Sequence, residues 1–364
     1  MVAGAAVTAA DAGADLPTTA AEAVAEGLRA LGRISAVHPV LRAAHVLDAG
    51  ACALLVVLDA LARAAADERP VAVPLDWLPA AAAHHGSTEA SGGAFEVMLL
   101  VSDEQPVVDT GAELRRRMGA VGDSVAVVGG DGWWHVHVHT DDPAAAIAGA
   151  ALGRREQVLV RLLSGAHAGG SAIDGGPQRW GVVVCTAAPE LASWYAATGA
   201  VTVVQCPEAP VRPVHLERAV VDSGAAHVVL LPGAIGTASE LAVPGVQVDV
   251  LDAHDELRLV VGALALAGAG STAEGRAAAE AALARLDAVE VEVGSVQSVC
   301  DATDALVAVR RDVPAESLTV LLRDAPDDGL VDGIVAHLAT RHPGIEPTVV
   351  GPTGHGPALV IGLD

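Results

Sequence analysis

Three histidines alternate with other residues in the segment W-W-H-V-H-V-H-T-D-D-P, at residues 133–143. An extended strand turns successive side chains to opposite faces, so His135, His137 and His139 are predicted to share one face, about 7 Å apart from one to the next. Imidazoles followed by a carboxylate such as that of Asp141 favour a metal or anion site. The spacing alone is equally compatible with a solvent-exposed strand face that carries polar side chains.

A strand, a tight turn and a second strand are needed to position these histidines. Residues 125–128 form an apolar run, and the G-G-D-G that follows contains turn residues able to adopt positive φ angles. The flanking pattern predicts a strand at 95–101, helices at 111–118 and 143–152, and a strand at 157–163. The order β-α-β-β-α-β predicts a ferredoxin-like domain, with both helices on one face of an antiparallel sheet and the histidines on the open face.

The rest of the chain predicts a multidomain protein of α/β and α+β type. Residues 1–66 indicate a frayed end followed by helices near 20–31, 37–44 and 51–66, whose apolar faces have little to cover them. Pro- and Gly-rich stretches predict linkers at 67–92 and 165–178, on either side of the ferredoxin-like domain at 93–164. From 179 to 364, apolar strands alternate with helices in two lobes, which favours a parallel sheet covered on both faces; a helix at 235–242 and a strand at 306–310 are among the predicted elements.

Composition limits the classes of function. The 364 residues include 45 acidic and 21 basic side chains, for a formal net charge of −24, and such a surface repels nucleic acid and anionic membranes. The sequence contains no lysine, which excludes a P-loop lysine and a Schiff-base lysine. Four scattered cysteines predict reduced thiols, and no segment is typical of a signal peptide or a membrane-spanning helix, so we expect a cytoplasmic protein without membrane insertion.

Three stretches carry a family resemblance. Residues 40–61 read V-L-R-A-A-H-V-L-D-A-G-A-C-A-L-L-V-V-L-D-A-L, and residues 122–143 read G-D-S-V-A-V-V-G-G-D-G-W-W-H-V-H-V-H-T-D-D-P. The tail contains V-V-L-L-P-G-A at 228–234 and G-H-G-P-A-L-V-I-G-L-D at 354–364. Over residues 20–364 the chain resembles the bacterial fatty-acid kinase A family, whose members join a dihydroxyacetone-kinase-like domain to a DegV-like domain.

This resemblance implies a role in lipid metabolism. Residues 1–66 would be a helical remnant of the dihydroxyacetone-kinase-type nucleotide domain, and residues 179–364 a DegV-like α/β domain. A DegV-like protein that carries a fatty acid is the implied partner, and a homodimer is left open. No nucleic acid partner is expected.

The kinase motif of that family is missing here. The family holds Mg²⁺ on the ATP phosphates with the carboxylates of D-G-D-x-G-x-N-M, because Mg²⁺ requires oxygen ligands. This sequence contains no such motif, so ATP and Mg²⁺ are not expected as cofactors and no catalytic residue is assigned. Asp48 and Gly50 are interpreted as the surviving edge of the nucleotide pocket. The chain is then either a fragment or a kinase-deficient protein.

The resemblance also bears on metal binding. In the family, a cysteine on the preceding strand accompanies the two histidines that match His137 and His139; Glu96 matches a family glutamate, but an alanine occupies the cysteine position. Two imidazoles are too few for a structural zinc site, which usually has four ligands. Asp141 or His135 would have to complete it, and a Zn²⁺ ion on His137, His139 and Asp141 is therefore one interpretation.

We expect a docking scaffold for a DegV-like fatty-acid-binding protein. One alternative is a small-molecule sensor, with its ligand on the open sheet or in the α/β cleft, where the G-A-I-G-T stretch at 233–237 follows a strand. The other alternative is a metal-assisted phosphotransferase or hydrolase that uses His137, His139 and Asp141.

Overall fold

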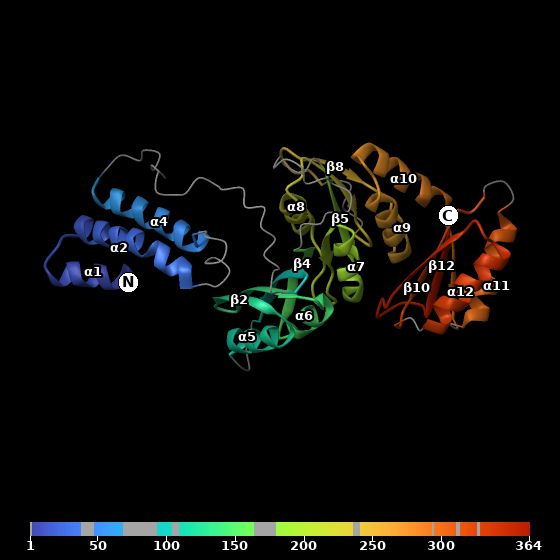
Figure 1. Ribbon diagram of the computed structural model, residues 1–364, viewed down its shortest axis with the longest axis horizontal. Coiled ribbons are helices and arrows are strands. Elements are labelled where there is room, and N and C mark those ends of the chain that lie inside the picture. The colour runs from blue at the N-terminus through green and yellow to red at the C-terminus, as the bar shows by residue number, and fades with distance from the viewer. Residues whose placement is uncertain are drawn as a thin grey trace. The chain divides into compact units, whose positions relative to one another are not determined.

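The computed structural model describes residues 2–37, 47–67, 93–103, 109–163, 180–235, 241–292, 295–310, 314–325 and 328–364. The chain divides into two units, residues 1–91 and 92–364. The described part of the first unit is helical, and the second contains two sheets with helices packed on them (Figure 1). The predicted multidomain α/β class is confirmed.

Three described helices make up the first unit: α1 (Val2–Asp11), α2 (Leu16–Val37) and α4 (Ala49–Ala65). Helix α4 starts two residues before the predicted start at Ala51, because Asp48 accepts a hydrogen bond from the backbone N–H of Ala51 at 2.6 Å and so caps the helix. The prediction of a frayed end was wrong, since the alanine-rich start of the chain has strong helix propensity and forms α1. Most of the helix predicted at 37–44, and nearly all of the linker at 67–92, lie outside the described residues.

An eight-stranded sheet forms the centre of the second unit, in the order β2-β3-β1-β4-β6-β5-β7-β8. Strands β2, β3, β1, β4 and β6 pair antiparallel along this order, whereas β6, β5, β7 and β8 pair parallel. The strands are β1 (Phe95–Ser102), β2 (Asp123–Gly130), β3 (Trp133–Thr140), β4 (Arg154–Leu162), β5 (Gly181–Thr186), β6 (Val201–Val204), β7 (His227–Leu231) and β8 (Gln247–Val250).

The first half of this sheet follows the chain order β1-α5-β2-β3-α6-β4, with α5 (Thr110–Val121) and α6 (Pro143–Gly149) on one face. Alternation along β3 buries Trp134, Val136 and Val138 against those helices and turns the histidines to the other face. Strand β4 then pairs with β6, so residues before and after the predicted linker at 165–178 share one sheet. That linker lies outside the described residues, and the proposed domain limits stay predictions.

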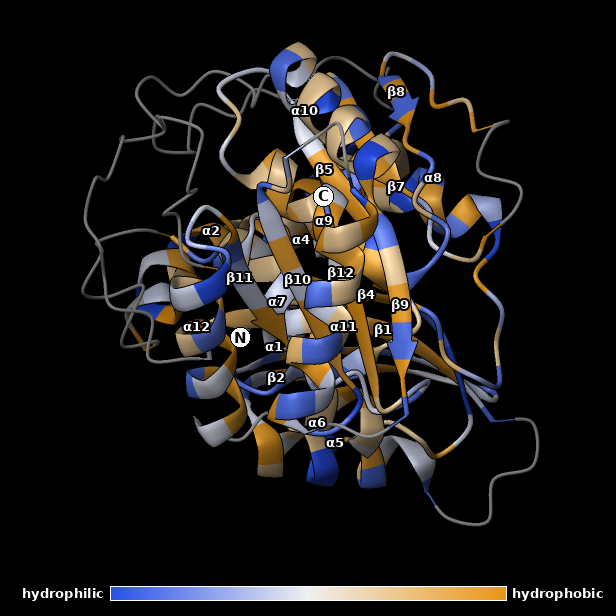
Figure 2. Ribbon diagram, turned by 90° about the vertical axis from the view of Figure 1, so that its right-hand side faces the viewer, coloured by the Kyte–Doolittle hydropathy of each residue, from blue (hydrophilic) through white to orange (hydrophobic). Residues whose placement is uncertain are grey.

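Helices cover the parallel half on both faces. Helix α7 (Ala192–Ala197), the short turn η1 (Pro189–Leu191) and α9 (Glu256–Ala267) pack on the same side as α5 and α6, and α10 (Thr272–Arg285) packs on α9. Helix α8 (Pro213–Asp222) packs on the opposite face, over β4 to β7 (Figure 1). Figure 2 shows both hydrophobic and hydrophilic residues along α10, and the residues of this helix that are buried are the small Gly275, Ala279 and Ala282.

A second sheet of four strands has the order β11-β10-β12-β9, with strands β9 (Asp287–Val291), β10 (Ser317–Leu322), β11 (Glu346–Val350) and β12 (Leu359–Leu363). Helices α11 (Val296–Val309) and α12 (Asp328–Arg341) pack on it. The strand predicted at 306–310 was wrong: Ser295 caps α11, and the apolar run is the last turn of that helix. Most of the helix predicted at 235–242 lies outside the described residues.

Across the residues that the structure describes, every helix is too short or too polar to span a bilayer.

Candidate metal centre

Strand register brings a buried glutamate beside the predicted histidines. Glu96 on β1 lies directly opposite His139 on β3, and on its other side it lies opposite Arg161 on β4. His137 is two residues before His139, so it points to the same face. Three residues from two neighbouring strands therefore converge, because opposite positions on paired strands bring their side chains into contact.

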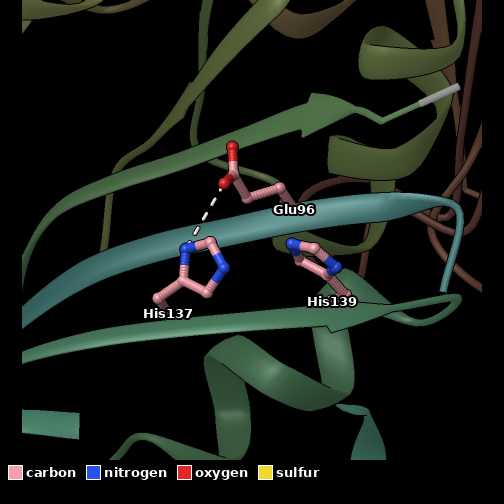
Figure 3. A group of neighbouring side chains, drawn as sticks. All are labelled: Glu96, His137 and His139. Carbon is pink, nitrogen blue, oxygen red and sulfur yellow. Dashed lines mark ion pairs between the residues drawn. The ribbon is translucent and has the colours of Figure 1, made fainter. Parts of the chain in front are cut away.

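The three side chains have the arrangement of a metal-binding group (Figure 3). One ligand atom from each of Glu96, His137 and His139 lies within 4.8 Å of the other two. Glu96 Oε1 is 3.3 Å from His137 Nδ1, and the two imidazole ring centres are 4.9 Å apart. The second oxygen of Glu96, Oε2, accepts a hydrogen bond from Arg161 Nε. Arg161 thus holds the carboxylate in a fixed direction and leaves Oε1 facing the imidazoles.

Burial keeps His137 in the form that a metal needs. Partial burial of the ring lowers the pKa of His137, and the nearby His139 and Arg161 act in the same direction, whereas Glu96 opposes them. A lowered pKa favours the neutral imidazole, whose free nitrogen lone pair is the metal ligand. Glu96 itself is only 6% exposed, and its charge is balanced by Arg161.

The structure brings some of the predicted site residues together and places others elsewhere. His137 and His139 come together, whereas His135 is exposed and lies opposite Leu100, outside the group. Asp141 is committed elsewhere, because its Oδ1 accepts a hydrogen bond from the backbone N–H of Ala94 at 2.7 Å.

Sequence reasoning noted Glu96 only as a family match and did not place it among the ligands. A local signal existed: a glutamate inside an apolar strand, on the face opposite to Val97 and Val101, needs a partner when it is buried.

The donor set fits a zinc ion. Two imidazole nitrogens and one carboxylate oxygen are a ligand set found in zinc sites that keep a fourth position for water. With bonds of about 2.0–2.1 Å, tetrahedral ligands lie roughly 3.3 Å apart, and the 3.3 Å between Glu96 Oε1 and His137 Nδ1 already matches this spacing. Arg161 can keep Oε2 throughout, as an outer partner that orients the ligand.

Within the described part of the second unit, α8 is the helix that packs on the face that carries this centre, and it packs over β4 to β7. On β2 and β3, Val128 and Trp133 are 67% and 51% exposed and project to the same face as His135.

A second polar group lies where the parallel strands reverse their order. Strand β5 is flanked by β6 on one side and β7 on the other, and the crevice at such a point is the usual ligand site of an open α/β sheet. There Oε1 of Glu256 accepts hydrogen bonds from Thr186 Oγ1 at 2.8 Å and from the hydroxyl of Tyr195 at 2.6 Å. Burial raises the pKa of Glu256, and both hydrogen bonds act against that rise. The group was not foreseen from the sequence.

The loop proposed to bind an anion is described only in part. Gly233 has φ of +60° and donates its N–H to the carbonyl of Ala253, while residues 236–240 lie outside the described range. In the first unit, Asp48 uses its carboxylate to cap α4, and Gly50 lies in the first turn of that helix. Their role as the edge of a nucleotide pocket stays a prediction.

Comparison with known proteins gives one family match. Residues 93–168 match the family of FakA-like middle domains, that is, middle domains of proteins like fatty acid kinase A. None of the curated proteins matches the chain.

Among solved structures, the dihydroxyacetone kinase from C. freundii in complex with AMP-PNP and Mg²⁺ is similar over 57% of this chain and 50% of its own, with 11% identity and a TM-score of 0.35. The DegV family protein Cg2579 from Corynebacterium glutamicum is similar over 51% of this chain and 96% of its own, with 14% identity and a TM-score of 0.34. The chain spans half the length of the dihydroxyacetone kinase that it matches. Glu96, His137 and His139 all lie within residues 93–168, the stretch that matches the family of FakA-like middle domains.

Proposed function

We propose that this protein is a docking scaffold in a fatty-acid kinase system, and that the open sheet face of its middle domain binds a DegV-like protein that carries the fatty acid. The family match of residues 93–168 carries this proposal. Val128 and Trp133 support it, because large exposed side chains on an open sheet face are suited to be interface anchors.

The scaffold is proposed to act without phosphoryl transfer of its own. The family's aspartate motif for Mg²⁺ and ATP is not in this sequence, and Asp48 has its carboxylate engaged in capping a helix. Isothermal titration calorimetry of the full chain with ATP and Mg²⁺ is expected to give no binding heat. Measurable ATP affinity would contradict this part of the proposal.

Zinc is proposed to organise the docking face. Glu96, His137 and His139 would hold the ion, which would join β1 to β3 next to the exposed anchors. When bound, the ion supplies a fixed positive charge and a Lewis acid at the sheet surface. Elemental analysis of wild-type protein that has been loaded with zinc and desalted is expected to show zinc bound at this centre. The variant His139→Gln, treated in the same way, is expected to lack that ion.

The docking proposal is tested by binding of a purified DegV-like fatty-acid-binding protein from the same genome, measured by biolayer interferometry. Trp133→Ala is expected to weaken binding at least about tenfold, which corresponds to ~1.4 kcal/mol. Val128→Ala is expected to weaken binding less, because it removes a smaller side chain.

Val309→Ala is the matched control for Val128→Ala. Val309 is an exposed valine at the end of α11, far along the chain from the proposed face, and its replacement is expected to leave affinity unchanged. If wild-type protein fails to bind the partner with or without fatty acid, the docking proposal is refuted.

A second candidate function is metal-assisted phosphotransfer or hydrolysis at the same centre. The three-ligand set favours it, because zinc sites with one open position activate water. Zinc-loaded protein would then hydrolyse a phosphomonoester such as p-nitrophenyl phosphate, and His139→Gln would abolish that activity. Zinc-loaded protein without activity towards such esters removes this candidate and leaves the scaffold.

A further inference from the structure

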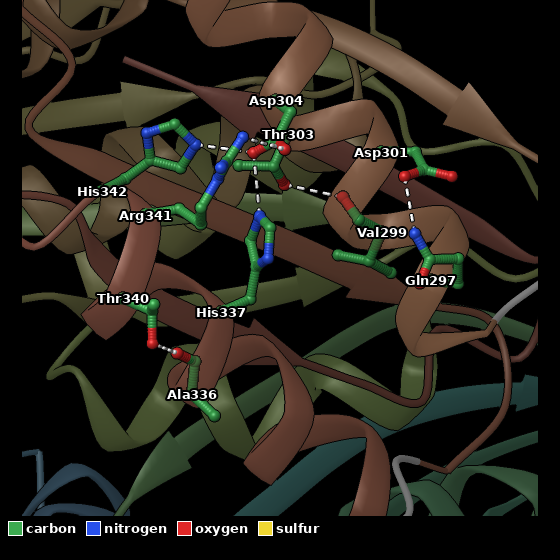
Figure 4. Close-up of polar contacts among 10 residues, drawn as sticks. All are labelled: Gln297, Val299, Asp301, Thr303, Asp304, Ala336, His337, Thr340, Arg341 and His342. Atoms are coloured by element: carbon green, nitrogen blue, oxygen red, sulfur yellow. Dashed lines mark hydrogen bonds and ion pairs between the residues drawn. The ribbon is translucent and has the colours of Figure 1, made fainter.

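A second group of imidazole and carboxylate side chains lies between α11 and α12, in the four-stranded part of the second unit. Asp304 is on α11, His337 is on α12, and His342 follows the end of α12. One ligand atom from each lies within 4.8 Å of the other two. Figure 4 shows both imidazoles directed at the carboxylate of Asp304.

The local fold holds these three positions firmly. The backbone N–H of His342 donates a hydrogen bond to the carbonyl of Leu338 at 2.8 Å. This bond continues the hydrogen-bond pattern of the last turn of α12 and so fixes the position of the His342 backbone. Near the other end of the pair, a Cβ on Gly333 would lie 2.5 Å from Cγ1 of Val296, so the two helices approach closely there. Asp304 therefore meets His337 on a packed helix pair, and His342 lies directly after the last residue of α12.

The geometry is convergent. The Nε2 atoms of His337 and His342 lie 2.8 Å and 2.7 Å from the same oxygen, Oδ1 of Asp304, and the two ring centres are 5.9 Å apart. The other oxygen, Oδ2, faces Nη2 of Arg341 at 3.6 Å. An isolated histidine–carboxylate ion pair contains one imidazole, whereas here two imidazoles contact the same carboxylate oxygen.

The charge around the group favours a cation. The carboxylate of Asp304 supplies a negative charge directly beside both imidazole nitrogens. The two histidines lie at the carboxyl end of α12, where the helix dipole is negative. A formal net charge of −24 raises the local concentration of divalent cations further.

We propose that Asp304, His337 and His342 form a second site for a divalent transition metal of the zinc class, which ties α12 to α11. Two imidazole nitrogens favour such an ion over Mg²⁺ or Ca²⁺, which take oxygen ligands. A zinc ion with bonds of about 2.0–2.1 Å sets its ligands roughly 3.3 Å apart, so the contacts of 2.7 and 2.8 Å must open by roughly 0.6 Å. Side chains that are only partly buried can make this adjustment, and water completes the fourth position.

The experiment measures zinc bound by the full chain after removal of metal with a chelator, reloading and desalting. His342→Gln and Asp304→Asn are each expected to lower the bound zinc by one ion per chain relative to wild type. The same two changes made in a His139→Gln background are expected to remove the remaining ion. This second series isolates the α11–α12 site, so its outcome does not depend on whether Glu96, His137 and His139 bind zinc.

A matched control and a second readout make the test decisive. His227 on β7 forms a 2.7 Å pair with Asp249 that contains a single imidazole, and His227→Gln is expected to leave the zinc content unchanged. Because the ion binds the folded form, zinc is expected to raise the melting temperature of His139→Gln protein but not that of the double variant His139→Gln/His342→Gln. Far-UV circular dichroism checks that each variant is folded. Folded His139→Gln/His342→Gln protein that holds as much zinc as His139→Gln protein would overturn the proposal.

Discussion

The hydroxyl of Tyr195 offers a direct test of the buried group in the α/β crevice. Tyr195 is fully buried on α7, and its hydroxyl donates to Oε1 of Glu256 at 2.6 Å. Tyr195→Phe removes this donor and keeps the ring, so it opens almost no cavity. The change therefore isolates one hydrogen bond to a buried carboxylate.

The magnitude follows from the charge of the acceptor. A hydrogen bond to a charged group contributes about 1.5–3 kcal/mol, so we expect Tyr195→Phe to lower the free energy of unfolding by that amount while Glu256 is ionised. The pKa of Glu256 in the folded protein is raised above its ordinary value of 4.5, chiefly by burial. Its contribution to stability is thus fully present below that ordinary pKa and is lost as pH rises through the folded pKa.

We expect Tyr195→Phe to lose more stability than the wild type as the pH rises. The Tyr195 hydrogen bond favours the ionised carboxylate, so its removal raises the pKa of Glu256 further. The stability deficit of Tyr195→Phe is therefore expected to be larger at alkaline pH than near the ordinary glutamate pKa.

Urea unfolding followed by near-ultraviolet circular dichroism measures this difference. Trp194 and Trp180 belong to the same packed cluster and report on it. With a slope of about 2–3 kcal/mol per molar urea, the midpoint should fall by roughly 0.5–1.5 M at alkaline pH. Thr202→Val is the control, because the buried hydroxyl of Thr202 has no hydrogen-bond partner among the described residues and its loss should cost little. Equal stability of Tyr195→Phe and wild type at alkaline pH, or a larger deficit in acid, would refute this reasoning.

Three further substitutions test other parts of the structure. Asp48→Ala removes the cap that receives the Ala51 N–H and should lower the stability of the helical unit by about 1 kcal/mol, seen as a lower midpoint in helical circular dichroism, while Asp48→Asn should retain most of it. Gly233→Ala places a Cβ against the carbonyl oxygen of Cys185 at a φ of +60°, and should cost about 1–3 kcal/mol in urea unfolding; a stable variant would mean that the turn relaxes freely. Glu96→Gln keeps the shape of the side chain but removes its charge, and should weaken zinc binding at the sheet centre at least about tenfold in competition with a chromogenic chelator, whereas unchanged affinity would exclude Glu96 as a ligand.

The alternation of residues along one strand was enough to predict the part of the candidate metal centre that lies on β3. The period-two alternation from Trp133 to Thr140 determined which side chains are buried, and it placed His137 and His139 on one face because that alternation is a property of any strand. The cap at Asp48 was predictable for the same reason, since a capping side chain acts within three residues of its own position.

Contacts between distant segments were the part that the sequence could not supply. Glu96 reaches His139 only because β1 and β3 pair in one particular register, and a shift of one residue would turn Glu96 to the core face. Asp304 and the two histidines that it meets are separated by 33 and 38 residues, so nothing in their spacing signals a common site. The apolar run that ends α11 was mistaken for a strand because a short run has no period that separates the two states.

The two histidine–carboxylate groups offer the same kinds of ligand, but their carboxylate–imidazole distances differ, and this difference determines how far the ligands must move when zinc binds. In both groups one carboxylate oxygen faces the imidazoles and the other faces an arginine, Arg161 or Arg341, so an ion can enter without displacing the arginine. At the sheet centre the arginine fixes a buried carboxylate, and Glu96 Oε1 lies 3.3 Å from His137 Nδ1, which is about the spacing of two tetrahedral zinc ligands. Between α11 and α12 both imidazoles already contact Asp304 directly, so zinc must replace those hydrogen bonds and push the ligands apart. Because Arg341 is largely exposed, water screens its repulsion of the ion, whereas Arg161 is less exposed and its partner Glu96 is buried, so that this pair is screened less and orients the ligand.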